Sequence, residues 1–142
     1  MGASPPRHAD LAAGRWQSLT LVEQLANVGS EVDRAIKAHE AGRSDRRDAA
    51  VDRGLELFDL TAADHRWRGA RRREVLRARE EFCALFWGDG EQRGAAASLS
   101  RYFLHFALAA RRAIRPLRRM RPRGRLRFDL LPNGKRLRFR CT

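Results

Sequence analysis

Arginine side chains recur at near-alternate positions toward the C-terminal end of the chain. They are Arg118, Arg119, Arg121, Arg123, Arg125 and Arg127. An extended backbone would point many of them to one side, and a guanidinium group forms a fork that matches phosphate oxygens. This spacing predicts a surface for the phosphate backbone of RNA or DNA, and nothing in it indicates that individual bases are read.

A second basic cluster stands where a helix is expected to begin. Arg66 and Arg68 precede a run of three arginines, Arg71, Arg72 and Arg73. Cations at a helix N-terminus oppose the helix macrodipole, so they require a negatively charged partner. That partner is either an acidic helix face or an external phosphate, and we expect the run of three to take part in binding nucleic acid.

An acidic stripe is the other candidate contact surface. Its members follow one another at steps of 3, 4, 4 and 3 residues, which places them on one face of a helix. They are Asp45, Asp48, Asp52, Glu56 and Asp59. Two interpretations remain open: the stripe is a solvated face, or it docks arginines from a neighbouring helix or subunit. The second interpretation predicts a subunit interface at Asp48, Asp52 and Glu56.

Residue types that support catalysis or hold a metal are present but not grouped. The four histidines lie in different segments, without the spacing that pairs two metal ligands on one helix. Cys83 lies among apolar residues, where we expect a buried, unreactive thiol, and Cys141 is far from it in the sequence. We therefore predict no catalytic residues, no metal, no cofactor and no enzymatic activity.

Helical periodicity accounts for most of the chain that must position these residues. One face of a helix is marked by residues that follow one another at steps of 4, 3, 4, 4 and 3: Leu21, Leu25, Val28, Val32, Ile36 and His39. Thr20 and Glu23 match a capping box at its start, and Gly42 stands where a terminating glycine is expected. Trp16 is expected to pack beneath this start.

Three further helices are expected to follow. One opens at Ser44 and has a broad apolar face of Ala50, Val51, Gly54, Leu57, Phe58 and Thr61. The next is "ARRREVLRAREEFCALFWG", and the last runs from Ser98 until Pro116 stops it. The last helix is expected to bury an alanine-rich face that lets a neighbour approach closely. Together, helices of about 15–22 residues with short loops predict an all-α, up-down-up-down four-helix bundle over residues 16–115. Residues 1–15 read as a flexible lead.

Residues 116–142 read as an arginine-rich tail. Within it, "RLRFDLL" and "KRLRFRC" flank "PNG", and apolar residues alternate with polar ones in both. Asn133 and Gly134 are a strong turn signal, so a β-hairpin with one apolar and one arginine face is expected. The alternation favours burial of Phe128 and Phe139 over stacking on bases. A lone hairpin is marginal in water, so it must pack on the bundle, pair with another chain or order on a ligand.

The charge of the chain is unevenly placed. Residues 111–142 hold 13 arginines and lysines against one aspartate, whereas residues 1–110 hold 17 against 16 acidic residues. Such asymmetry indicates a polyanionic partner, although only two of the 30 basic residues are lysine, which also fits a bias of composition in a GC-rich genome.

No stretch approaches the roughly 18 apolar residues of a membrane span, and the N-terminus has no apolar signal core. We expect a cytoplasmic protein without a membrane partner.

Several segments of the expected helices resemble a known family. They are "LTLVEQLANVGSEVDRAIKAHEAG", "DRGLELFDLTAAD", "REVLRAREEF" and "YFLHFALAARR". The family is that of small bacterial four-helix-bundle proteins grouped with the accessory variability determinants of diversity-generating retroelements, and more distantly with the proteins of 23S rRNA intervening sequences. The resemblance covers about residues 16–112. It implies a non-enzymatic homopentameric barrel that binds nucleic acid and a partner reverse transcriptase.

The sequence departs from this family in its charge. The expected bundle is almost neutral, whereas accessory determinants are basic throughout, and the basic tail is not part of the family pattern. Either the tail supplies the missing charge, or the scaffold has a different function. One alternative is an oligomeric interaction module whose acidic stripe and arginine cluster pair between subunits without nucleic acid.

Another alternative is a ribonuclease. "RYFLHF" is similar to the spaced Arg–His motif of the HEPN ribonucleases, which are also helical bundles, but here only three residues separate Arg101 from His105. This resemblance implies that Arg101 and His105 line a cleft between two subunits.

Overall fold

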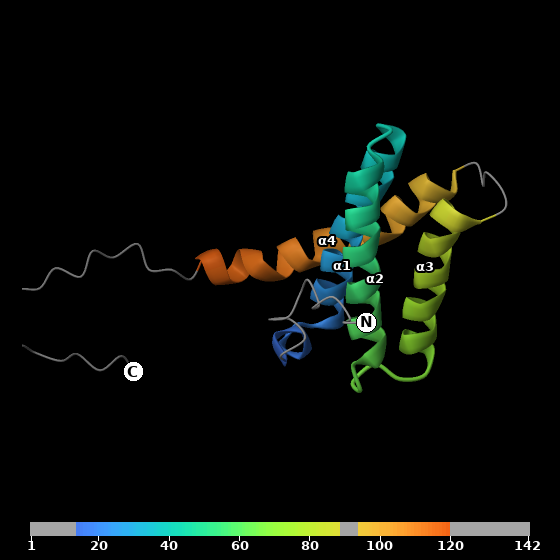
Figure 1. The fold of residues 1–142 in the computed structure, drawn as a ribbon. Coiled ribbons are helices and arrows are strands. Elements are labelled where there is room, and N and C mark those ends of the chain that lie inside the picture. Colours follow the sequence, from blue (N-terminus) through green and yellow to red (C-terminus); the bar gives the residue numbers. More distant parts are fainter. Residues whose placement is uncertain (1–13, 89–93, 120–142) are drawn as a thin grey trace, which may run out of the picture.

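The computed structural model describes residues 14–88 and 94–119, with side chains as far as Ile114. This part of the chain consists of a short 3-10 helix, η2 (Trp16–Ser18), and four α-helices: α1 (Leu21–Glu40), α2 (Ser44–Ala63), α3 (Ala70–Trp87) and α4 (Ala95–Arg119) (Figure 1). The described residues include no strand. The expected all-α class with four helices is therefore confirmed, whereas the β-hairpin expected in the tail lies outside the described residues.

The start and end of α1 follow directly from its sequence. The Thr20 hydroxyl accepts a hydrogen bond from the Glu23 backbone N–H at 3.3 Å, and the Glu23 carboxylate accepts one from the Thr20 backbone N–H at 2.8 Å. The Glu23 carboxylate also accepts a hydrogen bond from the Thr20 hydroxyl at 2.9 Å, and the two bonds to this carboxylate, chiefly the one from the backbone of Thr20, lower the pKa of Glu23. After Ala41 the chain turns at Gly42, whose φ of 65° favours glycine. The capping box and the terminating glycine are both confirmed.

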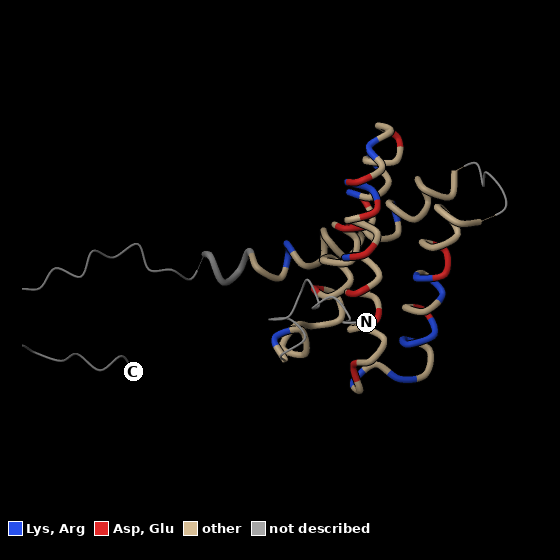
Figure 2. Tube along the Cα trace, viewed as in Figure 1, with Lys and Arg blue, Asp and Glu red and all other residues tan. Residues whose placement is uncertain are grey.

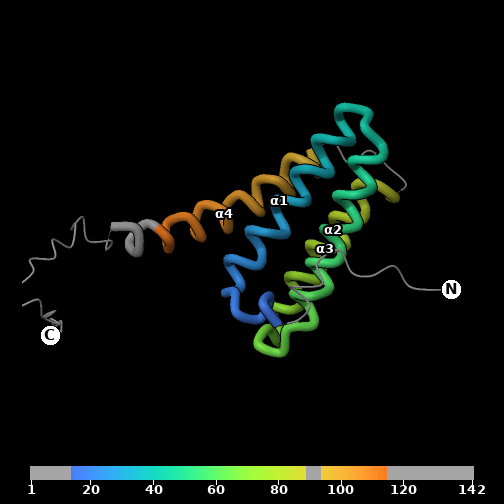
Figure 3. Tube along the Cα trace, turned by 60° about the vertical axis from the view of Figure 1, so that its left-hand side comes forward, coloured from blue at the N-terminus to red at the C-terminus, as the bar shows by residue number. Residues whose placement is uncertain are grey.

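The helices are not all aligned. In Figure 1, α1, α2 and α3 lie side by side and each reverses the direction of the one before, whereas α4 crosses α1 obliquely. Figure 3 shows the same crossing from another side, with the C-terminal half of α4 extending away from the other helices. A regular up-down-up-down bundle of all four helices is therefore not confirmed.

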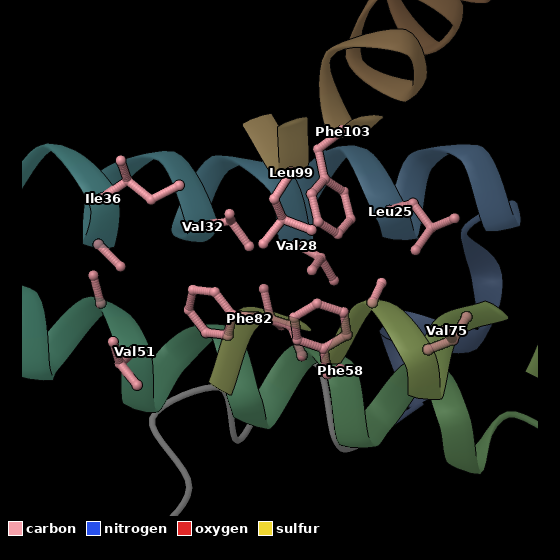
Figure 4. Packing of buried hydrophobic residues seen from close by; sticks show 14 of the residues in the cluster. Leu25, Val28, Val32, Ile36, Val51, Phe58, Val75, Phe82, Leu99 and Phe103 are labelled. Carbon is pink, nitrogen blue, oxygen red and sulfur yellow. The ribbon is translucent and has the colours of Figure 1, made fainter. Parts of the chain in front are cut away.

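Aromatic rings from three helices meet at the centre of the core. The ring centroid of Phe58 on α2 lies 5.8 Å from that of Phe82 on α3 and 5.9 Å from that of Phe103 on α4. Val28 and Val32 of α1 are fully buried in the same cluster (Figure 4). The face predicted for α2 is buried throughout. It consists of Ala50, Val51, Gly54, Leu57, Phe58 and Thr61.

The close approach of α4 to α1 depends on a glycine. A Cβ atom added at Gly29 would lie 2.6 Å from Cβ of Phe103, so only glycine fits at this crossing. We expected alanines of α4 to allow this approach, and that prediction is wrong, because Ala109 and Ala113 are exposed beyond the crossing.

The boundaries of α4 also differ from expectation. The helix begins at Ala95, one turn before the predicted Ser98, and continues past Pro116 to Arg119. Pro116 was expected to stop it, which is wrong. A proline in the last turn removes a single N–H donor, the one that would bond to the carbonyl of Arg112, so the helix can complete one more turn.

Candidate nucleic-acid interface

The turn that leads from α2 into α3 is held by a buried polar network. Gln24 of α1 is fully buried. Its Nε2 donates to the carbonyl of Trp16 at 2.9 Å and to Oδ2 of Asp64 at 3.0 Å, and its Oε1 accepts from Nε1 of Trp67 at 2.7 Å. Trp16, buried as predicted, donates to the Thr61 hydroxyl at 3.2 Å. The network fixes the start of the basic cluster to the start of α1.

Arg66 belongs to this network. Its Nη2 lies 2.6 Å from Oδ2 of Asp64 and also donates to the carbonyl of Leu19 at 2.8 Å. The Asp64 side chain is fully buried, and the hydrogen bonds from Arg66 hold the pKa of Asp64 well below its usual range. Arg66 is therefore engaged in holding the fold.

Arg71, Arg72 and Arg73 are exposed in the first turn of α3. This turn contains no acidic residue, and the residue before it, Gly69, supplies no side-chain cap. The guanidinium of Arg71 lies 6.0 Å from the ring centroid of Trp67, and none of the three arginines forms an ion pair within residues 14–88 and 94–114. Three cations therefore lie at the positive end of a helix dipole, an arrangement that an external anion would stabilise.

The acidic stripe lies on α2 and is partly used within the chain. Asp59 accepts a hydrogen bond from Nε of Arg79 on α3 at 2.8 Å, and Asp48 accepts one from its neighbour Arg47 at 2.7 Å. Asp52 is exposed and Glu56 is half-buried. The contact between Asp59 and Arg79 matches the expected docking of arginines from a neighbouring helix, whereas contact with another subunit stays a prediction.

The C-terminal arginines fall at the edge of the described chain. Arg118 and Arg119 form the end of α4, while Arg121, Arg123, Arg125 and Arg127 lie outside the described residues. Arg111 and Arg112, which precede them on the extending half of α4, are exposed. Figure 2 shows both signs of charge along α2 and α3, in agreement with the near-neutral composition of the first 110 residues.

Residues with possible catalytic or metal-binding roles form no cluster of three or more in the described part of the chain. Arg101 and His105 are exposed, one turn apart on α4, and the described residues contain no group of three or more metal-ligating side chains. Burial, followed by the nearby Glu74 carboxylate, raises the pKa of Tyr102 to about 12, which keeps its hydroxyl protonated. Cys83 is half-buried, so the expected full burial of its thiol is wrong; Cys141 lies outside the described residues.

Neither Gln24 nor Asp64 was predicted as a functional residue from the sequence. The signal was nevertheless present, because Gln24 stands on the apolar face of α1, between Leu21 and Val28. A glutamine in such a place must find buried hydrogen-bond partners. Which residues supply them depends on contacts 40 positions away in the chain.

The described residues form an all-helical fold with separate basic surfaces. Comparisons with protein-family models, with curated proteins and with solved structures found no match. None of the helices in the described residues is both long and apolar enough to pass through a lipid bilayer.

Proposed function

We propose that this protein is a non-enzymatic, self-associating helical protein that binds RNA or DNA through the phosphate backbone. In this proposal it acts like the accessory protein of a diversity-generating retroelement reverse transcriptase, as the resemblance of its helices implies. A cytoplasmic location is part of the proposal, because nucleic acid and a reverse transcriptase would be met there.

The observation that carries the proposal is the separation of charge along the molecule. Residues 111–142 hold 13 of the 30 basic residues and only one of the 17 acidic residues. Residues 111–142 begin on the C-terminal half of α4, which extends away from the other helices (Figure 1). Arg111 and Arg112 are exposed there. A dense set of cations that begins on this half of α4 is suited to a phosphate backbone, and Arg71, Arg72 and Arg73 supply a second contact.

Self-association is supported by an apolar face that continues beyond the body. Leu99 and Phe103 are buried on one face of α4, and Phe106, Ala110 and Ile114 follow on that face at steps of 3, 4 and 4 residues. Ile114 is 50% exposed. A second subunit covering this face would add the helix neighbours that α4 lacks and would complete the expected bundle. The resemblance sets the expected assembly as a pentameric ring.

The same apolar face also favours the second candidate, an oligomeric interaction module without nucleic acid. In that case the tail would order by packing on the assembly and would contribute to stability alone. A HEPN-like ribonuclease is supported less, because Arg101 and His105 are closer in sequence than in that family.

Removal of residues 120–142 tests the proposal. This truncation ends the chain at Arg119 and retains every described helix. Filter binding of labelled single-stranded RNA and DNA should show that most of the affinity is lost, while the helical circular dichroism signal is retained. Unchanged affinity together with a lower melting temperature would contradict the proposal and support the interaction module.

A further inference from the structure

A groove of about 400 Å³ lies between α1 and α2, near the turn that joins them. Its floor contains three alanines, Ala38, Ala49 and Ala50, whose small side chains leave space between the two helices. All its other lining residues are basic: Arg34 and Lys37 from α1, Arg43 from the residue that precedes α2, and Arg46 and Arg53 from α2. Arg34 and Lys37, three residues apart, lie on one face of α1, and Arg43 at the N-cap of α2 is followed by Arg46 in its first turn.

One carboxylate beside the groove neutralises part of this charge. Glu31, whose side chain is only 8% exposed, accepts hydrogen bonds from Arg34 and, at 3.0 Å, from Nε of Arg53. Lys37, Arg43 and Arg46 are exposed and form no ion pair within the described part of the chain. The nearby Asp48 is engaged by Arg47 and does not line the groove. Among the residues that line the groove, positive charge therefore remains in excess.

The groove has the properties of an anion site. A concave surface lined by one sign of charge concentrates the electrostatic field and attracts counter-ions. Its volume falls within the range of about 300–1,000 Å³ that is usual for ligand sites. Guanidinium groups from two sides of the groove can each donate two hydrogen bonds to phosphate oxygens. A single carboxylate has only two oxygens and would engage few of these guanidinium groups.

We propose that this groove binds phosphate groups, supplied either by a nucleic-acid backbone or by a free oligophosphate. The groove is separate from the surfaces described above. It lies at the α1–α2 turn, and Arg71, Arg72 and Arg73 follow the α2–α3 turn at the other end of α2 (Figure 1). The inference is therefore independent of binding by the tail, and either can fail without the other.

Nuclear magnetic resonance of the full-length protein, labelled with ¹⁵N, tests the inference with sodium tripolyphosphate as the probe. The backbone amide signals of Ser44, Asp45 and Arg46 should shift as tripolyphosphate is added. Shifts that persist after truncation at Arg119 exclude binding of the probe to residues 120–142 as their cause. Absence of such shifts in the folded protein would overturn the inference.

Two triple variants with equal charge changes provide the comparison. Lys37→Ala, Arg43→Ala and Arg46→Ala together should weaken the binding reported by these signals about tenfold or more, since charge-assisted hydrogen bonds are among the strongest in proteins. Arg68→Ala, Arg77→Ala and Arg101→Ala together should leave it unchanged. Equal weakening in both variants would overturn the inference, because net charge alone would then explain the binding.

A competition experiment distinguishes the two sources of phosphate. If a single-stranded oligonucleotide displaces tripolyphosphate and produces its own shifts at Ser44, Asp45 and Arg46, the backbone of nucleic acid occupies the groove. If only tripolyphosphate produces these shifts, the groove takes a free oligophosphate. Both results support a phosphate site. Truncation after Arg119 should leave the tripolyphosphate shifts intact even where nucleic-acid binding is lost.

Discussion

Gly29 is the residue on which the position of α4 depends most directly. The backbone of α1 lies against Phe103 at this point, and an added Cβ would lie 2.6 Å from Cβ of Phe103. We expect Gly29→Ala to lower the free energy of unfolding by about 1–3 kcal/mol, as overpacking of a well-packed core usually does. Urea denaturation measures this change. Ser30→Ala, at an exposed neighbouring position, should change stability by less than about 0.5 kcal/mol; equal effects of the two variants would contradict the account.

Asp64 makes stability depend on pH. Arg66 holds the pKa of Asp64 below the ordinary value of 3.8, so the unfolded chain takes up the proton first as the pH falls. The stability from this group is therefore present above about pH 5 and declines as the pH falls toward the lowered pKa. We expect Asp64→Asn to cost about 1–3 kcal/mol at pH 7, the usual cost of a buried group that loses its partner.

The cost of Asp64→Asn should shrink in acid, and denaturation of both proteins between pH 7 and pH 2.5 measures it. Asp59→Asn is a suitable control, because this carboxylate forms an exposed ion pair with Arg79, and such pairs contribute about 0–1 kcal/mol. A cost of Asp64→Asn that stays constant over this pH range would contradict the assigned role of Arg66.

At the scale of elements, the extending half of α4 is the part most open to a partner. Ile114 continues the face buried by Leu99 and Phe103. We expect Ile114→Asp to lower the molar mass measured by light scattering at micromolar concentration, with the helical signal retained. Leu108→Asp introduces the same charge on another face of α4, where 42% of Leu108 is exposed, and should leave the mass unchanged. A wild-type protein that is strictly monomeric would contradict self-association itself.

The acidic stripe of α2 is a second surface on which assembly is expected to depend. Reversing Asp52 and Glu56 to lysine should break the assembly while the helical signal persists, because like charges would then face the arginines of a neighbouring subunit. Reversal of both Glu80 and Glu81 to lysine, two exposed acids on α3, is the matched control. If light scattering finds the same molar mass for the wild-type protein and both variants, the acidic stripe is not part of the subunit interface.

Local signals predicted the elements better than their arrangement. The capping box at Thr20, the glycine at Gly42 and the periodic face of α2 depend on residues within a few positions of one another, and the structure has all three. The oblique course of α4 depends instead on the contact of Gly29 with Phe103, 74 positions apart in the sequence. No periodicity within α4 could reveal that contact, and Pro116 was too close to the helix end to act as a stop.

At the scale of the whole molecule, the chain combines a nearly neutral helical body with a strongly basic C-terminal segment. The segregation of charge could be predicted from the sequence because it is a property of composition. The groove between α1 and α2 could not, because its cations come together only when the helices pack side by side. Lys37 lies on α1 and Arg43 is the N-cap residue of α2, and the turn at Gly42 brings the two helices together.

The salt dependence of nucleic-acid binding tests the central claim most directly. Six to eight phosphate contacts predict that log K falls against log salt concentration with a slope of roughly −4 to −7 for the full-length protein. Changing Arg121, Arg123, Arg125 and Arg127 to alanine should make this slope shallower by about 3 and weaken all sequences alike, because phosphate contacts carry no base information. The same slope in both proteins, or a slope near zero in the full-length protein, would contradict a phosphate-binding arm.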